Sequence, residues 1–64
     1  MAFREKLAFL MRENRETKYW LAKCIGCSQS SVTNWLNGIQ PQRGNITKLA
    51  EHYGITPKEL EQEE

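Results

Sequence analysis

The feature that most constrains the fold is a two-residue joint between two short segments in the middle of the chain. Residues 18–25 and 28–37 both carry apolar side chains at helical spacing, and only Gly26 and Cys27 separate them. A connection that short, with a glycine in the turn, forces two helices to cross steeply. Ala22 is small enough to let the second of these helices pack closely against the first.

The same stretch meets further requirements that two crossing helices impose on a shared core. Counted from Lys18, the fourth, eighth, tenth, fifteenth and eighteenth positions must be apolar or nearly so. They are occupied by Leu21, Ile25, Cys27, Val32 and Trp35. Each condition alone is common, but all of them at fixed spacing predict two helices joined by a tight turn.

Residues that begin or end helices predict five helices along the chain, of which these two are the second and third. Thr17 and Ser28 can cap their first turns, whereas Gly26 and the Asn37-Gly38 pair end them. No segment alternates apolar and polar residues over a useful length, so no strand is predicted. The sequence therefore predicts an all-α fold.

Three further helices complete this fold. The first covers residues 3–14 and the fourth covers residues 45–53. The fifth begins with a capping box between Thr56 and Glu59, with Pro57 at its first helical position. Helical spacing places inward Phe3, Leu7, Leu10, Met11 and Asn14 of the first helix, Ile46, Leu49, Ala50 and Tyr53 of the fourth, and Leu60 of the fifth.

The length of 64 residues predicts a single domain over residues 1–64. Such a chain buries only about 60% of its unfolded surface, which leaves little room for a catalytic cleft. The longest apolar stretch, around residues 6–11, is too short to span a bilayer. The N-terminus lacks the small-residue cleavage site of a signal peptide. We therefore expect a cytoplasmic protein that is not an enzyme and has no membrane partner.

The net charge of +1 hides an asymmetric distribution. Residues 1–58 hold all nine Lys and Arg against four Glu, a net charge of +5, and the acidic tip at residues 59–64 contributes −4. A basic body suits a polyanionic partner, but an ordinary solvated surface would have the same charge.

Cys24 and Cys27 form a Cys-x-x-Cys pair, a spacing that in other settings binds zinc or carries redox chemistry. Structural zinc needs four ligands, and the one histidine, His52, lies far along the chain. Two cysteines are too few for a disulfide framework, and no βαβ pattern supports a thioredoxin-like motif. We expect packing or surface cysteines, no metal and no cofactor.

With these motifs the chain resembles the Cro/repressor-type helix-turn-helix domains, also called XRE-type or lambda-repressor-like domains. Residues 27–39, CSQSSVTNWLNGI, carry most of the resemblance, and residues 46–57, ITKLAEHYGITP, match the family's fourth helix. The resemblance implies a five-helix DNA-binding domain whose third helix enters the major groove of double-stranded DNA. It also implies a phage or bacterial transcriptional repressor that binds a pseudo-palindromic operator as a homodimer.

The resemblance implies which residues of the third helix read bases. Family members read bases from the positions of Gln29 and Ser30, and Thr33 and Asn34 continue the same face. Glutamine or asparagine can form two hydrogen bonds to an adenine edge. Threonine can contact a thymine methyl group with its own methyl group or hydrogen-bond to a base with its hydroxyl.

The resemblance also implies phosphate contacts around that helix. Lys18 stands at the start of the second helix, where relatives often have glutamine, and Asn37 matches an asparagine that often donates to phosphate. Gln40, Arg43 and Asn45 are expected in the loop that usually rests on the DNA backbone. Such contacts position the protein and set its salt dependence without reading sequence.

Three positions depart from the family pattern. Many members pair an arginine with a glutamate at the positions of Met11 and Leu36, so an apolar contact here replaces an ion pair. That exchange removes a desolvation cost and can be neutral or stabilising. Glu16 stands before the second helix, where the family usually has an apolar residue.

Phe9, Tyr19 and Trp20 are expected on outer faces, whereas Trp35 is assigned to the core. An exposed apolar patch can mark a partner surface, although Phe9 and Trp20 could equally shield each other. These aromatics favour an alternative function, a protein–protein interaction module of the antitoxin-like or anti-repressor-binding kind that reuses the fold. The polar outer face of the third helix favours DNA instead.

Overall fold

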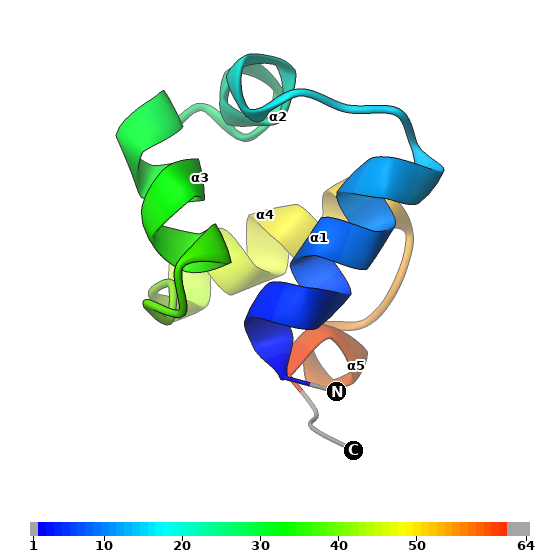
Figure 1. The fold of residues 1–64 in the computed structure, drawn as a ribbon. Helices are drawn as coiled ribbons and strands as arrows, with labels where there is room; N and C mark the ends of the chain where they lie inside the picture. The colour runs from blue at the N-terminus through cyan, green and yellow to red at the C-terminus, as the bar shows by residue number, and fades with distance from the viewer. Residues whose placement is uncertain (1, 62–64) are drawn as a thin grey trace.

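The apolar periodicity of the sequence produces five short helices. The computed structural model describes residues 2–61 (Figure 1). Its helices are α1 (Phe3–Glu13), α2 (Lys18–Ile25), α3 (Gln29–Leu36), α4 (Arg43–Tyr53) and α5 (Pro57–Glu61). No strand occurs among these residues, so the predicted all-α, five-helix fold is confirmed. Residues 62–64 of the predicted acidic tip lie outside the described residues.

Every helix contributes one apolar side to a shared core. Trp35 is 4% exposed, which confirms it as a core residue, and the fully buried Leu60 anchors the short α5. Pro41, between α3 and α4, is also buried. The buried apolar residues are Phe3, Leu7, Met11, Leu21, Ala22, Ile25, Val32, Trp35, Ile46, Leu49, Ala50 and Leu60.

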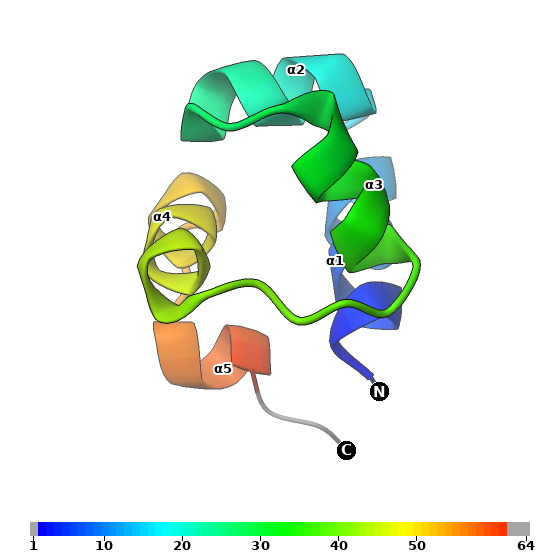
Figure 2. The same ribbon diagram turned by 90° about the vertical axis from the view of Figure 1, so that its left-hand side faces the viewer.

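The helices leave one side of α3 uncovered. In Figure 1, α2 lies across one end of the molecule and α5 lies at the opposite end. α3 packs against α2 and α1, whereas α4 packs against α2 and α5. In the turned view of Figure 2, α3 is at the front, and residues 37–42 run below it to α4. The front of α3 therefore faces solvent rather than another helix.

The joint between α2 and α3 forms as the sequence predicts. Gly26 adopts a left-handed conformation (φ 88°), and its N–H donates to the Ala22 carbonyl over 2.8 Å. The Ser28 hydroxyl then accepts from the Ser31 N–H over 3.2 Å and caps α3. Because Ala22 is only 2% exposed and has no bulk, α3 can pack directly against α2.

Two expected boundaries were wrong by one residue. α1 ends at Glu13 and Asn14 is its C-cap, so Asn14 is exposed instead of facing inward. Its amide donates to the Leu10 carbonyl over 2.7 Å, which ties the side chain to the helix end. α3 ends at Leu36, and Asn37 is its C-cap.

The predicted start of the fourth helix was also wrong. α4 begins at Arg43, two residues before the expected Asn45. Gln42 is its N-cap, and it forms no side-chain capping bond that the sequence could have signalled. Arg43 and Asn45 therefore lie in the first turn of α4 and not in the preceding loop.

Glu16 has a specific role in the turn between α1 and α2. Its side chain is 4% exposed, and the Tyr53 hydroxyl donates to its carboxylate over 2.6 Å. His52 Nε2 contacts the other carboxylate oxygen. Burial, and to a lesser extent the hydrogen bond to Glu16, raises the pKa of Tyr53 well above its ordinary value. Polar contacts between Glu16 and α4 thus replace the apolar residue that the family usually has at this position.

Candidate nucleic-acid interface

The outward side of α3 is polar throughout. Successive residues of an α-helix are about 100° apart, so positions 29, 33, 37, 30 and 34 follow one another around one side. Val32 and Trp35 lie on the opposite side and are buried. Thr33 is half-buried, and the other predicted base-reading residues are exposed. The structure thus places together on this face Gln29, Ser30, Thr33 and Asn34.

The segment after α3 continues this surface. Asn37 is exposed at the C-cap, where its backbone N–H donates to the Thr33 and Asn34 carbonyls. Gly38 has φ 107°, a conformation that side-chain-bearing residues rarely adopt. Gln40 is exposed in the loop beyond it. The turn therefore leaves the side chains of Asn37 and Gln40 open to solvent beside the end of α3.

The helix ends around this surface are electropositive. α1 and α5 carry Glu5 and Glu59 in their first turns, whereas α2, α3 and α4 have no acidic residue there. Instead, α2 begins at Lys18 and α4 begins at Arg43. A cation at a helix N-terminus opposes the helix dipole and costs about 0.3–1 kcal/mol. These two cations therefore do not stabilise their own helices. Together with the backbone N–H groups at a helix N-terminus, they can bind phosphate.

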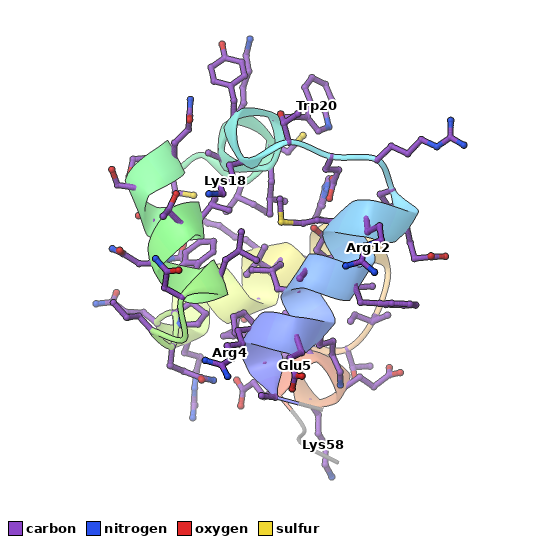
Figure 3. All side chains as sticks on the ribbon, in the orientation of Figure 1. Arg4, Glu5, Arg12, Lys18, Trp20 and Lys58 are labelled. Atoms are coloured by element: carbon purple, nitrogen blue, oxygen red, sulfur yellow. The ribbon has the colours of Figure 1, made fainter. Side chains whose placement is uncertain are left out.

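Lys18 and Arg43 flank α3 from two sides. In the view of Figure 3 the Lys18 side chain lies between α2 and α3. Arg43 opens α4 where the segment after α3 ends, and in Figure 2 this end of α4 points toward the viewer. Both side chains are exposed, whereas Asn45, one turn of α4 further in, is half-buried. The residues predicted to contact phosphate therefore lie around the polar face, at helix starts as well as in the loop.

The model of one protein family, described as the Cro/C1-type HTH DNA-binding domain, matches residues 6–62. The chain belongs to this family. Membership indicates binding of double-stranded DNA and transcription regulation, and the family is typically non-enzymatic. No curated protein and no solved structure matches the chain. Of the helices in residues 2–61, none has both the length and the apolar character needed to cross a membrane.

The Cro/C1-type domain has a cation beside its polar face that the sequence analysis missed. Lys23 Nζ lies 5.7 Å from the centroid of the Tyr19 ring, one turn earlier on α2. Both residues line a surface hollow of about 310 Å³ that also reaches Cys27 and Gln29. The i, i+4 spacing of Tyr19 and Lys23 was visible in the sequence, but only the crossing of α2 and α3 shows that Gln29 lies beside them.

The cysteines of the Cro/C1-type domain are free thiols. Cys24 is exposed on α2, and Cys27 is half-buried in the joint. Desolvation raises the pKa of the Cys27 thiol despite a backbone hydrogen bond and the charge of Lys48, which both act in the opposite direction. A raised pKa leaves less of the reactive thiolate at neutral pH. Residues 2–61 contain no group of three or more side chains suited to a metal ion.

Proposed function

We propose that this chain is a sequence-specific transcriptional repressor of phage or bacterial origin that acts in the cytoplasm and inserts α3 into the major groove. The observation that carries the proposal is the division of α3 into two sides. Val32 and Trp35 fix one side in the core, and the other side presents only small polar groups and amides. A helix held in this way can bring hydrogen-bonding side chains to base edges.

Each polar residue of α3 has a proposed role. Gln29 and Asn34 each form two hydrogen bonds to an adenine edge, since an amide matches adenine's paired donor and acceptor. Thr33 contacts a thymine methyl group, and Ser30 hydrogen-bonds to a base. Gln29 opens the helix, so it reaches deepest into the groove when α3 enters by its N-terminal end.

The phosphate contacts are proposed to hold α3 in register. Lys18 and Arg43 supply positive charge at helix starts, and Asn37, Gln40 and Asn45 supply neutral donors. One recognition helix reads one half-site, so we propose a homodimer on a pseudo-palindromic operator. The two half-sites would lie about 10–10.5 base pairs apart, one turn of the duplex.

A second function, a protein–protein interaction module, is favoured by the exposed aromatics. Phe9, Tyr19 and Trp20 are 47%, 58% and 52% exposed, and Figure 3 shows Trp20 pointing away from the helices. Ile39, which the sequence analysis did not single out, is 58% exposed. In this alternative the chain is an antitoxin-like or anti-repressor-binding module, and these side chains would contact its protein partner.

Selection of binding sites from a random duplex library, at near-physiological salt, distinguishes the two functions. A sequence-specific repressor enriches a roughly palindromic motif with half-sites one helical turn apart. Binding without enrichment would contradict the proposed repressor function and favour the interaction module. The control is the Gln29→Ala, Asn34→Ala double variant, which should still bind DNA weakly but lose the motif.

A further inference from the structure

The uncharged sequence of α3 raises the question of which charges hold its C-terminal end on DNA. Gln29–Leu36 contains no ionisable side chain, and the last turn has no basic residue. The C-terminal end of a helix carries a partial negative charge and repels phosphate. Lys18 and Lys23 come from α2, which precedes α3. A phosphate near the other end of α3 needs a cation from a different part of the chain.

Arg4, from the first turn of α1, lies at that end. Its Nη1 and Cδ atoms would be 3.6 Å and 3.9 Å from a Cβ atom built on Gly38, so the side chain runs along the turn that ends α3. Arg4 is exposed, and no carboxylate among residues 2–61 lies within ion-pair distance of it. A cation in the first turn of a helix opposes that helix's dipole, so α1 itself does not benefit from Arg4.

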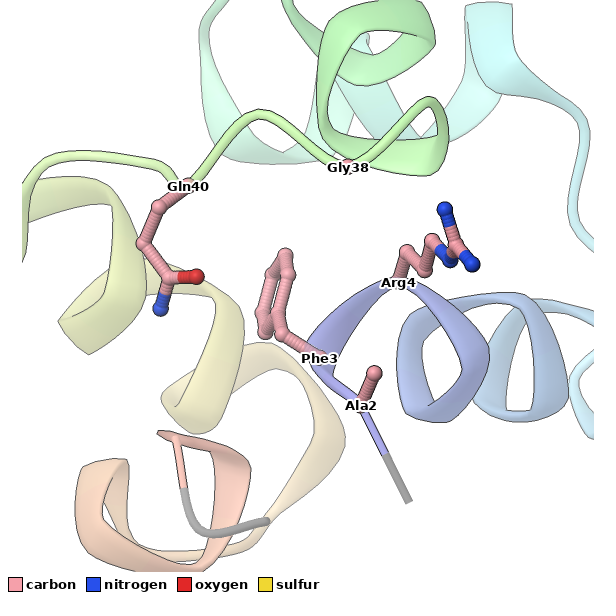
Figure 4. Close-up of a pocket in the computed structure, with 5 residues that line it drawn as sticks. All are labelled: Ala2, Phe3, Arg4, Gly38 and Gln40. Carbon is pink, nitrogen blue, oxygen red and sulfur yellow. The ribbon is translucent and has the colours of Figure 1, made fainter.

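Arg4 also lines a surface hollow of about 220 Å³ next to this turn. Figure 4 shows Gln40 on one side of the Phe3 ring and Arg4 on the other, with Gly38 above them. Neither the amide nor the backbone N–H of Gln40 donates a hydrogen bond to any described residue. Since the terminal torsion of glutamine is broad and roughly two-fold, its NH₂ group can turn into the hollow.

We propose that Arg4 binds a DNA backbone phosphate at the C-terminal end of α3, with Gln40 as a second donor. The inference rests on the proposed DNA-binding function and adds the start of α1 to the DNA-contacting surface. The guanidinium group offers paired N–H donors that match two oxygens of one phosphate. It also offsets the negative end of α3, so α3 is held at both ends by cations from neighbouring helices.

Other cations of α1 are less suited to this contact. Lys6 Nζ donates to the Glu59 carbonyl and so points toward α5. Arg12 lies eight residues beyond Arg4, which is about 12 Å along a helix axis. Figure 3 shows Arg4 near the end of α3 and Arg12 near the other end of α1. Arg12 is therefore a matched control, because it is an exposed arginine on the same helix.

The test is a salt titration of DNA binding by the full chain, with Arg4→Gln, Arg4→Lys and Arg12→Gln as variants. Arg4→Gln removes one phosphate contact from each bound protomer, which should lower the slope of log affinity against log salt by about 0.9 per protomer. For each bound protomer, the ratio of wild-type to Arg4→Gln affinity should then fall roughly 3.5-fold between 50 and 200 mM salt. The loss should be equal on the best site and on an unrelated duplex, Arg4→Lys should restore the slope, and Arg12→Gln should leave it unchanged.

The outcomes separate this inference from the function on which it rests. An unchanged slope for Arg4→Gln, on a duplex whose recognition still requires Gln29, would overturn the Arg4 contact and leave the proposed function in place. A chain that binds no duplex would overturn both. If Arg4 only stabilises α3, Arg4→Gln would lower the melting temperature without changing the salt slope, and that result would also refute the phosphate contact.

Discussion

Replacing Tyr53 with phenylalanine tests the hydrogen bond between α4 and the turn before α2. The change keeps the ring and removes only the hydroxyl that donates to Glu16 over 2.6 Å. A hydrogen bond to a charged group contributes about 1.5–3 kcal/mol, and the Glu16 side chain is too buried for water to replace the donor fully. We expect Tyr53→Phe to lower the free energy of unfolding by about 2 kcal/mol.

That loss is large for a domain of this size. At about 0.05–0.15 kcal/mol per residue, a chain of this length has a free energy of unfolding of roughly 3–10 kcal/mol. A loss of 1 kcal/mol lowers the melting temperature of such a small domain by about 4–8 °C, so Tyr53→Phe should lower it by about 8–16 °C. Urea unfolding followed by far-ultraviolet circular dichroism measures the difference directly.

The alkaline pH dependence provides a second readout of the same bond. Tyrosine ordinarily titrates near pH 10, and burial with the bond to Glu16 raises the pKa of Tyr53 above that value in the folded state. Above about pH 10 the unfolded chain therefore loses the Tyr53 proton while the folded chain keeps it, so stability falls as pH rises. Tyr53→Phe should remove this part of the fall.

The exposed Tyr19 is the matched control, because Tyr19→Phe removes a hydroxyl from a side chain that is 58% exposed. Its effect on the free energy of unfolding should stay within about 0.5 kcal/mol. The reasoning about Glu16 is refuted if Tyr53→Phe changes stability as little as Tyr19→Phe does and leaves the alkaline fall intact.

Three further predictions concern DNA binding and the core. Gln29→Ala should cost about 1–3 kcal/mol on the best site and relax the preference at one base pair; equal loss on every duplex would remove its base-reading role. Lys18→Ala should weaken binding to specific and unrelated duplexes alike and lower the salt slope by about one per bound protomer, which a titration of both duplexes checks. Trp35→Ala removes a core residue that is 4% exposed and should lower the free energy of unfolding by about 3–5 kcal/mol, a large part of the total, which urea unfolding followed by circular dichroism checks.

The α2–α3 unit was predictable because its determinants are local. Thr17, Gly26 and Ser28 act on backbone groups within four residues, and the structure forms each of those bonds. The capping box of α5 was predictable for the same reason, since Thr56 and Glu59 bond to each other across one turn. Helical spacing together with these capping residues therefore identified the helices and most of the core.

The start of α4 was not predictable in the same way. Gln42 forms no capping bond, and Gly44 in the first turn disfavours a helix, so no local signal marks Arg43 as its beginning. Burial of Pro41 in the preceding segment is a tertiary effect. The boundary matters because the structure places Arg43 at a helix start and not in a loop. At a helix start its positive charge opposes the helix dipole.

Two features of the structure depend on partners far apart in sequence. Glu16 was noted only as a departure from the family, because its partners His52 and Tyr53 are 36 and 37 residues away. Arg4 was overlooked because its place beside Gly38 follows from the packing of α1 against α3. Helical periodicity assigns residues to faces, but only the assembled helices show which faces meet.

The division of α3 into a buried and a polar side also bears on how such a protein changes over time. Val32 and Trp35 secure the helix, whereas Gln29, Ser30 and Asn34 are exposed and take no part in the core. Under the proposed function, substitutions at these three exposed positions alter the preferred operator at little expense to folding. A population of duplicated copies could therefore diverge to recognise new operators in single steps, each leaving an intact, foldable protein.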